Sequence, residues 1–227
     1  MSHFRILVAD DHDIVRQGIK AVLQTRAEWR VCGEARDGRQ AVTLARQLKP
    51  DMVVMDISMP NLNGLEATRE ILEHDAEQKV VVMTIMDTEQ VVRAALESGA
   101  RGFVLKSDAA RDLVAAIEAL QQKGTFFTPR VAQMILHGFL KPGEGSSQIP
   151  PQPTSLTRKE RHIVQLLAEG KSTKEVATIL NLSVHTVETH RANILRKLKL
   201  HSIVELVRYA VQNNIVMIPT FHEALTS

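Results

Sequence analysis

The residues best suited to chemistry are carboxylates that follow short apolar segments. Residues 4–9 lead directly into Asp10 and Asp11, and residues 51–55 lead into Asp56. If both segments are strands of one parallel sheet, their carboxyl ends meet at the same edge, where such sheets hold their active sites. Neighbouring carboxylates repel one another unless a cation is present, and oxygen ligands of this kind suit Mg²⁺. The pattern therefore predicts a magnesium site.

A third carboxylate close by has a simpler explanation. Asp13 precedes an amphipathic segment with apolar residues from Ile14 to Leu23, and aspartate is a favourable N-cap residue. We therefore predict that Asp13 caps this helix. Capping does not account for Asp10 and Asp11, and metal binding is the better explanation of that pair.

The first half of the chain alternates between short apolar segments and amphipathic ones. Asp87 and Ser107 are the predicted N-caps of the fourth and fifth helices. The alternation predicts an α/β fold with a parallel sheet, right-handed crossovers and helices on both faces. Five strands, each followed by a helix, are predicted at residues 4–9, 31–35, 51–56, 79–84 and 101–105.

Two further polar residues fall at predicted strand ends. Thr84 closes the fourth strand, and Lys106 follows the fifth. A carboxylate such as Asp56 can accept a phosphoryl group as an acyl phosphate, provided that cations hold the charged oxygens. Asp10 and Asp11 would then bind Mg²⁺ together with Asp56. Lys106 would pair with the phosphoryl oxygens, and the Thr84 hydroxyl would donate a hydrogen bond to one of them.

Each of these residue types also has an ordinary structural role. Aspartate at a strand end often serves as a turn or cap residue, lysine can be a solvated charge, and threonine is common in strands. Their joint occurrence at the ends of four different strands is poorly explained by coincidence. The pattern therefore favours the phosphoacceptor hypothesis.

Composition limits the class of protein. The chain has 227 residues, 44% of them hydrophobic, which is enough for the cores of two domains. A single cysteine, Cys32, excludes an internal disulfide and favours a reducing, cytoplasmic compartment. We see no signal peptide or long apolar span, so we expect no membrane partner. Basic residues outnumber acidic ones only after residue 153, so only that part is expected to meet a polyanion.

Proline and glycine residues mark the expected division of the chain. Thr128 and Pro129 predict the start of a helix, and residues 141–153 contain four prolines and little to bury. We predict a first domain over residues 1–124, a helix and linker over 125–153, a second domain over 154–214 and a loosely held tail over 215–227.

The second domain is predicted to contain only helices. Helices over Thr173–Leu180 and Val184–Leu198, joined by a short turn, predict a helix-turn-helix. Four helix starts carry N-cap residues, three of them in capping boxes: Thr157 with Glu160, Ser172 with Glu175, Ser202 with Glu205, and Ser183 alone. The expected inner stripe is Val176, Ala177, Leu180, Val184, Val187, Ile194, Leu195 and Leu198.

The outer face of the second helix of this pair is rich in polar residues. Such a face is most often only solvated, but the basic balance and the turn favour DNA binding, because this helix is sized for the major groove. Near its start, base edges are within reach of Glu188, Thr189 and Ala192. Phosphate contacts are better suited to Lys174, Thr186, His190 and Arg191.

Residues 4–122 resemble the receiver domain of bacterial two-component response regulators. The similarity rests on the acidic pair, the pattern Asp56-x-x-Met-Pro-x-x-x-Gly, Thr84 and Lys106, in matching order and spacing. The resemblance implies a flavodoxin-like fold, with five strands in the order 2-1-3-4-5. It also implies that a histidine kinase phosphorylates Asp56.

Further roles follow from the same resemblance. It implies that Asp11, Asp56 and the backbone carbonyl of Ser58 bind the metal, with Asp10 helping through water. Phe103 matches the aromatic residue that turns inward once the threonine hydroxyl engages the phosphoryl group. Core packing is a compatible explanation of Phe103.

Residues 156–213 resemble the LuxR-type DNA-binding domain, and the two resemblances together place the chain in the NarL/FixJ class of response regulators. They imply a transcription regulator without enzymatic activity. They also imply a homodimer that forms through the last helix when phosphorylated and reads two half-sites of double-stranded DNA. The matching residues are Leu156-Thr157-x-x-Glu160, Glu169-Gly170-Lys171-Ser172-x-Lys174-Glu175-Val176-Ala177 and Leu182-Ser183-x-x-Thr186-Val187-x-x-His190-x-x-Asn193-Ile194-x-x-Lys197-Leu198.

Three alternatives remain open at this point. A Mg²⁺-dependent phosphatase or phosphotransferase would need a second carboxylate beside Asp56, where Ser58 stands. A flavodoxin-like cofactor binder is opposed by the acidic pair and by the lack of a glycine-rich loop after the first strand. A regulator that binds DNA regardless of phosphorylation is consistent with the sequence.

Overall fold

The computed structural model describes residues 3–140 and 156–216. The chain divides into two compact units, Met1–Ser155 and Leu156–Ser227. The proposed linker over residues 141–153 lies outside the described residues, as do residues 217–227 of the expected tail.

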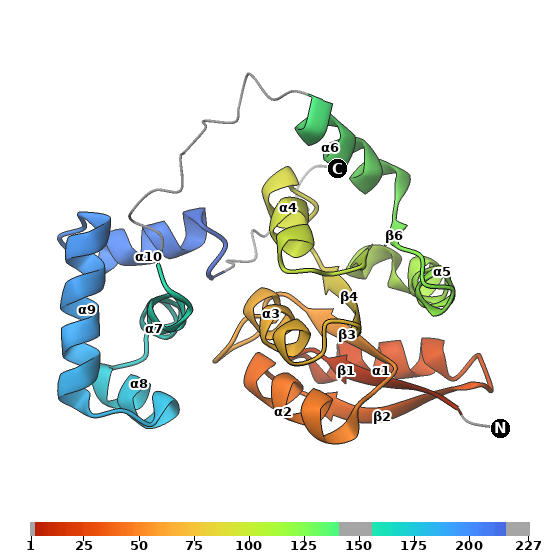
Figure 1. The fold of residues 1–227 in the computed structure, drawn as a ribbon, viewed down its shortest axis with the longest axis horizontal. Coiled ribbons are helices and arrows are strands. Elements are labelled where there is room, and N and C mark those ends of the chain that lie inside the picture. Colours follow the sequence, from red (N-terminus) through yellow and green to blue (C-terminus); the bar gives the residue numbers. More distant parts are fainter. Residues whose placement is uncertain (1–2, 141–155, 217–227) are drawn as a thin grey trace, which may run out of the picture. The chain divides into compact units, whose positions relative to one another are not determined.

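The first unit is built on a parallel sheet (Figure 1). Within the described residues, the sheet has six strands in the order β2-β1-β3-β4-β5-β6. The predicted order 2-1-3-4-5 is confirmed, but the count of five strands was too low. The strands are β1 (Phe4–Ala9), β2 (Trp29–Ala35), β3 (Met52–Asp56), β4 (Lys79–Thr84), β5 (Gly102–Leu105) and β6 (Phe126–Phe127).

The sixth strand is a two-residue edge strand. Phe126 and Phe127 pair with Gly102 and Phe103 of β5, and the Phe126 N–H donates to the Arg101 carbonyl at 3.1 Å. Two residues are too short for an alternating pattern, so the sequence carried no strand signal here.

Helices cover both faces of the sheet, as the unbroken apolar strands require. Ile6 and Val8 of β1 pack with α1 and α5, whereas Leu7 and Ala9 face α2 and α3, so β1 is buried on both sides. The helices that follow the first five strands are α1 (Asp13–Leu23), α2 (Gly38–Leu48), α3 (Gly64–His74), α4 (Glu89–Glu97) and α5 (Ala109–Gln121).

Three helix starts differ from the predictions. Asp13 is the first residue of α1 rather than its cap, and its carboxylate pairs with Arg16. Thr88, not Asp87, caps α4 by accepting from the Val91 N–H at 3.4 Å. Ser107 lies in a 3-10 turn over Lys106–Asp108, so Asp108 takes the N-cap position and α5 begins one residue later than expected. Of these three helices only α4 has a side-chain cap, since the side chains of His12 and Asp108, the N-cap residues of α1 and α5, accept no hydrogen bond from the backbone of their helices. Each start is shifted by a single residue, and local sequence does not distinguish between neighbouring polar residues at a helix end.

The predicted helix at Pro129 is present as α6 (Pro129–Leu140), which packs on α4. Val131 of α6 is 1% exposed. The side chain of Arg130 lies 2.7 Å from Asp87, in the loop that enters α4. The α6 helix is therefore part of the first unit rather than a free spacer.

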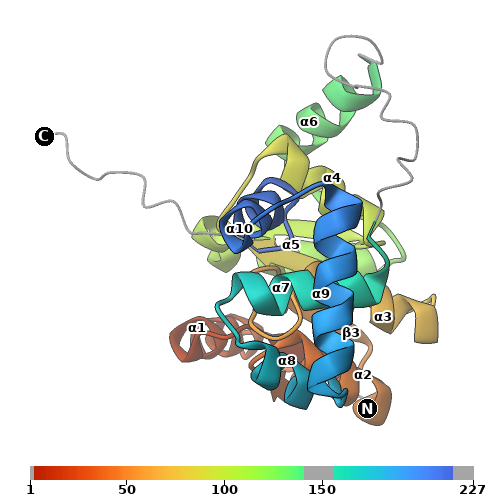
Figure 2. The same cartoon turned by 90° about the vertical axis from the view of Figure 1, so that its left-hand side faces the viewer.

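The second unit contains four helices among the described residues, and α9 is the longest of them (Figure 2). Helix α7 contacts the other three. The predicted bounds of both helix-turn-helix helices are confirmed, and Asn181 ends the first with φ 52. The helices are α7 (Arg158–Ala168), α8 (Thr173–Leu180), α9 (Val184–Leu198) and α10 (Ile203–Gln212).

Three details of the second unit correct the predictions. The Ser202 hydroxyl accepts from the Glu205 N–H at 3.2 Å, as predicted. The Glu205 carboxylate, however, accepts from the His201 N–H at 2.8 Å instead of the Ser202 N–H, so this half of the third capping box is displaced by one residue. Val184 is 38% exposed and lies outside the inner stripe. Ile215, which was assigned to the tail, is 1% exposed and packs in the core of the unit.

Candidate functional site

The predicted polar residues meet at the carboxyl edge of the sheet. Asp10 follows β1, Asp56 ends β3 and Lys106 follows β5. Lys106 Nζ lies 2.8 Å from Asp10 Oδ2 and 2.9 Å from Asp56 Oδ2. Both carboxylates are almost completely buried, at 0% and 1% exposure. The lysine therefore bridges carboxylates that are 46 positions apart in the sequence.

The loop after β3 turns back sharply beside Asp56. The Gly64 N–H donates to the Ile57 carbonyl at 2.9 Å. A Cβ atom at Gly64 would lie 1.8 Å from the Asp56 carbonyl oxygen, so only glycine fits at this position. Close packing of the loop on its own strand holds the Asp56 backbone in place.

The carboxylate cluster fits a divalent cation. Donor atoms of Asp10, Asp11, His12 and Asp56 lie within 4.8 Å of one another. Asp10 Oδ2, Asp11 Oδ1 and Asp56 Oδ2 are buried and accept no well-directed hydrogen bond from the described residues. In the described structure the one cationic group paired with these oxygens is the Lys106 ammonium, and the His12 imidazole lies near the acidic pair, with Nδ1 2.7 Å from Asp11 Oδ1. Carboxylate oxygens with unused lone pairs are the ligands that Mg²⁺ prefers.

Burial and charge set the ionisation of the pocket. Burial raises the pKa of Asp56 to about 6; the Lys106 ammonium opposes this shift, and the Asp10 and Asp11 carboxylates add to it. Burial lowers the pKa of Lys106, but Asp56 and Asp10 outweigh burial, so that pKa is raised. The pocket thus holds a charged lysine beside carboxylates that repel one another.

The remaining predicted residues lie on β4, on β5 and in the loop after β3. Thr84 is fully buried at the end of β4, and its hydroxyl accepts from the Met86 N–H at 3.2 Å. Phe103 is 1% exposed within β5. Ser58 is half-buried in the loop after Asp56. Thr84 pairs in register with Leu105, the residue before Lys106, so Thr84 and Lys106 share one edge of the sheet.

Two residues at this edge were missed by the sequence analysis. His12 brings an imidazole to the acidic pair, and Arg16 is a buried arginine beneath it. The spacing of Arg16, Ile19 and Leu23 already placed the arginine on the buried face of α1. A charged residue on an apolar face is the signal that could have found it.

Six of the predicted DNA-contacting residues lie between positions 186 and 192 of α9, and Lys174 lies in the first turn of α8. Lys174, Glu188, Thr189 and Ala192 are exposed, and Thr186, His190 and Arg191 are half-buried. Two of their hydroxyls already have partners: Thr189 Oγ1 donates to the His185 carbonyl at 2.9 Å, and Thr186 Oγ1 lies 2.7 Å from Ser183 Oγ. The exposed side chains give α9 a polar outer face.

Fold and site together define a class of protein. The first unit is a doubly wound α/β domain whose sheet edge carries a lysine-bridged carboxylate pocket, and the second is a helix-turn-helix domain. This combination is that of a receiver joined to a DNA-binding domain.

Comparison with known proteins identifies the family. Residues 6–118 match the response regulator receiver domain, and residues 154–210 match the bacterial regulatory proteins of the luxR family. The transcriptional regulatory protein LiaR of Bacillus subtilis is 35% identical over 212 residues, which are 93% of this chain and 99% of LiaR. DegU of Brevibacillus brevis is 32% identical over 94% of this chain and 95% of its own length. The chain therefore belongs to the NarL/LuxR-family response regulators.

A solved structure of this family has the same fold. The RcsB response regulator of Salmonella typhimurium is 27% identical, with a TM-score of 0.56 over 93% of this chain and 100% of that one. A structure of an RcsB–DNA complex matches equally well, with a TM-score of 0.56 at 26% identity over 93% of this chain and 99% of that chain. This chain is accordingly a response regulator with a receiver domain and a LuxR-type DNA-binding domain, in a family of transcription regulators.

Among the described residues, no helix has both the length and the apolar character needed to cross a membrane.

Proposed function

We propose that Asp56 is the phosphoacceptor of this response regulator and that a histidine kinase in the cytoplasm phosphorylates it. Phosphorylation then favours a homodimer whose α9 helices bind double-stranded DNA and regulate transcription. The observation that carries the proposal is the position of Lys106, with its ammonium group within 3 Å of both Asp10 and Asp56.

The proposed reaction uses the residues of this pocket. An Asp56 carboxylate oxygen attacks the phosphorus of a phosphohistidine, so an O–P bond forms while the N–P bond breaks and its electron pair stays on the histidine nitrogen. Lys106 supplies a fixed positive charge for the transferred phosphoryl oxygens. The Thr84 hydroxyl, after turning from the Met86 N–H, donates a hydrogen bond to another phosphoryl oxygen.

Asp10, Asp11, Asp56 and the Ser58 carbonyl would hold Mg²⁺, which neutralises charge on the phosphoryl oxygens when bound. The buried carboxylate oxygens without well-directed hydrogen bonds support this assignment. Phe103 is the proposed switch residue; it is already inward, at 1% exposure, and would be kept there when Thr84 engages the phosphoryl group.

The polar face of α9 supports the DNA-binding part of the proposal. Glu188, Thr189 and Ala192 face solvent near the start of the helix, where side chains reach base edges in the major groove. Phosphate contacts, which position a protein without reading sequence, fall to Lys174, Thr186, His190 and Arg191. The solved DNA complex of RcsB supports the same use of this domain.

The experiment that tests the proposal measures binding of the purified full-length protein to a selected DNA pool, with and without a small phosphodonor and Mg²⁺. We expect the donor to tighten binding by wild type but not by Asp56→Ala. Glu77→Gln, which removes a carboxylate that is 88% exposed, serves as the matched control and should respond like wild type. Equal binding by wild type and Asp56→Ala in both conditions would show that Asp56 is not the control point.

A further inference from the structure

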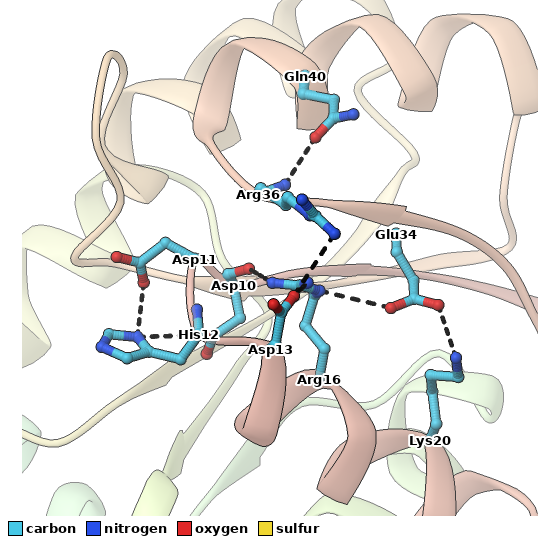
Figure 3. A network of polar contacts seen from close by, with 9 residues as sticks. All are labelled: Asp10, Asp11, His12, Asp13, Arg16, Lys20, Glu34, Arg36 and Gln40. Atoms are coloured by element: carbon cyan, nitrogen blue, oxygen red, sulfur yellow. Dashed lines mark hydrogen bonds and ion pairs between the residues drawn. The ribbon is translucent and has the colours of Figure 1, made fainter.

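A buried arginine lies beside Asp10, the first residue of the acidic pair (Figure 3). Arg16 is in the first turns of α1 and is 2% exposed. Its neighbours on the buried face of the helix, Ile19 and Leu23, are apolar. Arginine is almost never fully buried unless its charge and its donors are paired, so its contacts indicate why it is there.

The guanidinium group of Arg16 joins three elements of the fold. Nη1 donates to the backbone carbonyl of Asp10 at 2.8 Å, at the end of β1. Nη2 pairs with the Asp13 carboxylate at the start of α1, and Nε lies 3.4 Å from Glu34 Oε2 on β2. Because the donors of arginine form a rigid fork, these contacts fix the three elements relative to one another.

Arg16 completes the fixation of Asp10. The Asp10 N–H donates to the Ala35 carbonyl at 3.1 Å, and Asp10 Oδ1 accepts from the His12 N–H at 2.9 Å. Asp10 Oδ2 lies 2.8 Å from Lys106 Nζ. The backbone carbonyl oxygen of Asp10 is its remaining polar atom, and it accepts a hydrogen bond from Arg16 Nη1. Arg16 thereby holds the backbone of the loop that carries both acidic residues, at Asp10 (Figure 3).

We propose that Arg16 is a positioning residue, which holds the Asp10 carbonyl so that the Asp10–His12 loop presents its carboxylates to a divalent cation. The inference rests on the proposed function, since that function gives the loop its metal ion. Arg16 acts through Asp10 and does not touch the reacting atoms. Residues that orient metal ligands typically change metal affinity tenfold to a hundredfold when they are replaced.

The charge of Arg16 makes the inference testable by sign. A positive charge close to a cation site weakens cation binding by repulsion. If Arg16 acted only through its charge, the protein would bind Mg²⁺ more tightly once Arg16 was replaced by a neutral residue. A positioning residue has the opposite effect, because its loss frees the loop. Arg16→Met is therefore expected to weaken binding although it removes a repulsive charge.

The two carboxylates that pair with Arg16, those of Glu34 and Asp13, each have a second basic partner. Lys20 Nζ remains 2.7 Å from Glu34 Oε1, and Arg36 remains 3.6 Å from Asp13 Oδ1. The Asp10 carbonyl loses its side-chain donor. The substitution thus acts mainly on the metal-binding loop.

The experiment titrates the full-length protein with Mn²⁺, whose free concentration is read by electron paramagnetic resonance, and competes it with Mg²⁺. We expect Arg16→Met to weaken affinity for both ions by about tenfold or more. Arg16→Lys keeps the charge and reaches fewer acceptors, so its affinity should lie between those of Arg16→Met and wild type. This variant also provides the test if Arg16→Met does not fold. Lys20→Met is the matched control, since it removes the same charge from the same helix, and it should bind at least as tightly as wild type.

The outcomes separate the two proposals. Arg16 variants that fold and bind Mn²⁺ as tightly as wild type, or more tightly, overturn the role of Arg16 and leave the phosphoacceptor site intact. An equal loss in Lys20→Met also overturns it, because charge or helix stability would then explain the effect. A wild-type protein that binds neither ion overturns the proposed metal site and the role of Arg16 with it, whereas Asp11→Asn should lose binding if the site is correct.

Discussion

Asp56 is a carboxylate that the fold keeps in an unfavourable environment. It is 1% exposed and lies beside two other carboxylates, and Lys106 compensates only part of the cost. A group held in this way is stabilised by a bound cation or by conversion to an uncharged form. Strain of this electrostatic kind at a single residue is common where a residue is kept for chemistry rather than for stability.

The pH dependence of folding should reveal this cost. The pKa of Asp56 rises from 3.8 to about 6 on folding, so the folded protein binds its proton more tightly than the unfolded chain does. The contribution of Asp56 to the free energy of unfolding is therefore neutral at low pH, decreases as the pH rises from about 4 to about 6, and stays unfavourable above that window.

Asp56→Asn removes this titration. In EDTA at pH 7, we expect the variant to exceed wild type in free energy of unfolding by up to about 3 kcal/mol, and to match it near pH 4. Urea unfolding of both proteins across this range measures the difference. Glu77→Gln should show no comparable gain, since its carboxylate is 88% exposed. A difference between wild type and Asp56→Asn that does not vary with pH would contradict the assignment.

At the scale of elements, most boundaries follow from local chemistry. Thr157 and Ser172 begin their helices through complete capping boxes, as their sequences predict. Asn181 ends α8 in the left-handed region, with φ 52 and ψ 50, and thereby sets the turn that leads into α9. Asparagine tolerates this conformation better than other residues with a Cβ atom, apart from aspartate.

This turn gives a prediction for α8 and α9. Asn181→Ala should lower the free energy of unfolding of the second unit by about 1 kcal/mol, because alanine is strained at positive φ. Asn181→Gly is the matched control and should lie within a few tenths of a kcal/mol of wild type. Thermal unfolding followed by circular dichroism compares the three proteins. Equal losses in both variants would mean that the Asn181 side chain, rather than the backbone conformation, supports the turn.

At the scale of the whole molecule, two units with different chemistry share one chain. The first unit carries the carboxylate pocket. Helix α6 packs on α4 and so belongs to this unit. The second exposes the apolar side chains of Ile203 and Val204 on α10, which are 38% and 73% exposed. These two side chains offer exposed apolar area for a contact in the first turn of α10.

The proposed dimer places this surface at the interface. Val204→Asp should weaken DNA binding of the phosphorylated protein by about tenfold, because it puts a charge where two α10 helices would meet. Its phosphorylation on treatment with phosphodonor and Mg²⁺ should be unchanged. Gln212→Asp, an exposed position on the same helix, is the control for charge alone. Light scattering and DNA titration measure the result, and dimeric Val204→Asp with wild-type affinity would exclude α10 as the interface.

The sequence alone determined the features that depend on short-range patterns. Unbroken apolar segments predicted the strands β1 to β5, polar residues at their ends predicted the pocket, and cap residues predicted the helix-turn-helix. Each of these patterns spans only a few neighbouring residues, because side-chain periodicity and capping are local effects. Asp56 and Lys106 could be placed together only because parallel strands carry their ends to the same edge.

The tertiary structure decided what depends on contacts between distant residues. The edge strand β6 is too short for a periodic pattern and exists through its pairing with β5. From the sequence Ile215 was predicted to be part of a tail, but in the structure it packs in the core of the second unit. The role of Arg16 depends on a carbonyl at the end of β1 and a carboxylate on β2. Long-range packing and hydrogen bonding select among locally equivalent choices, and a local pattern contains no information about that selection.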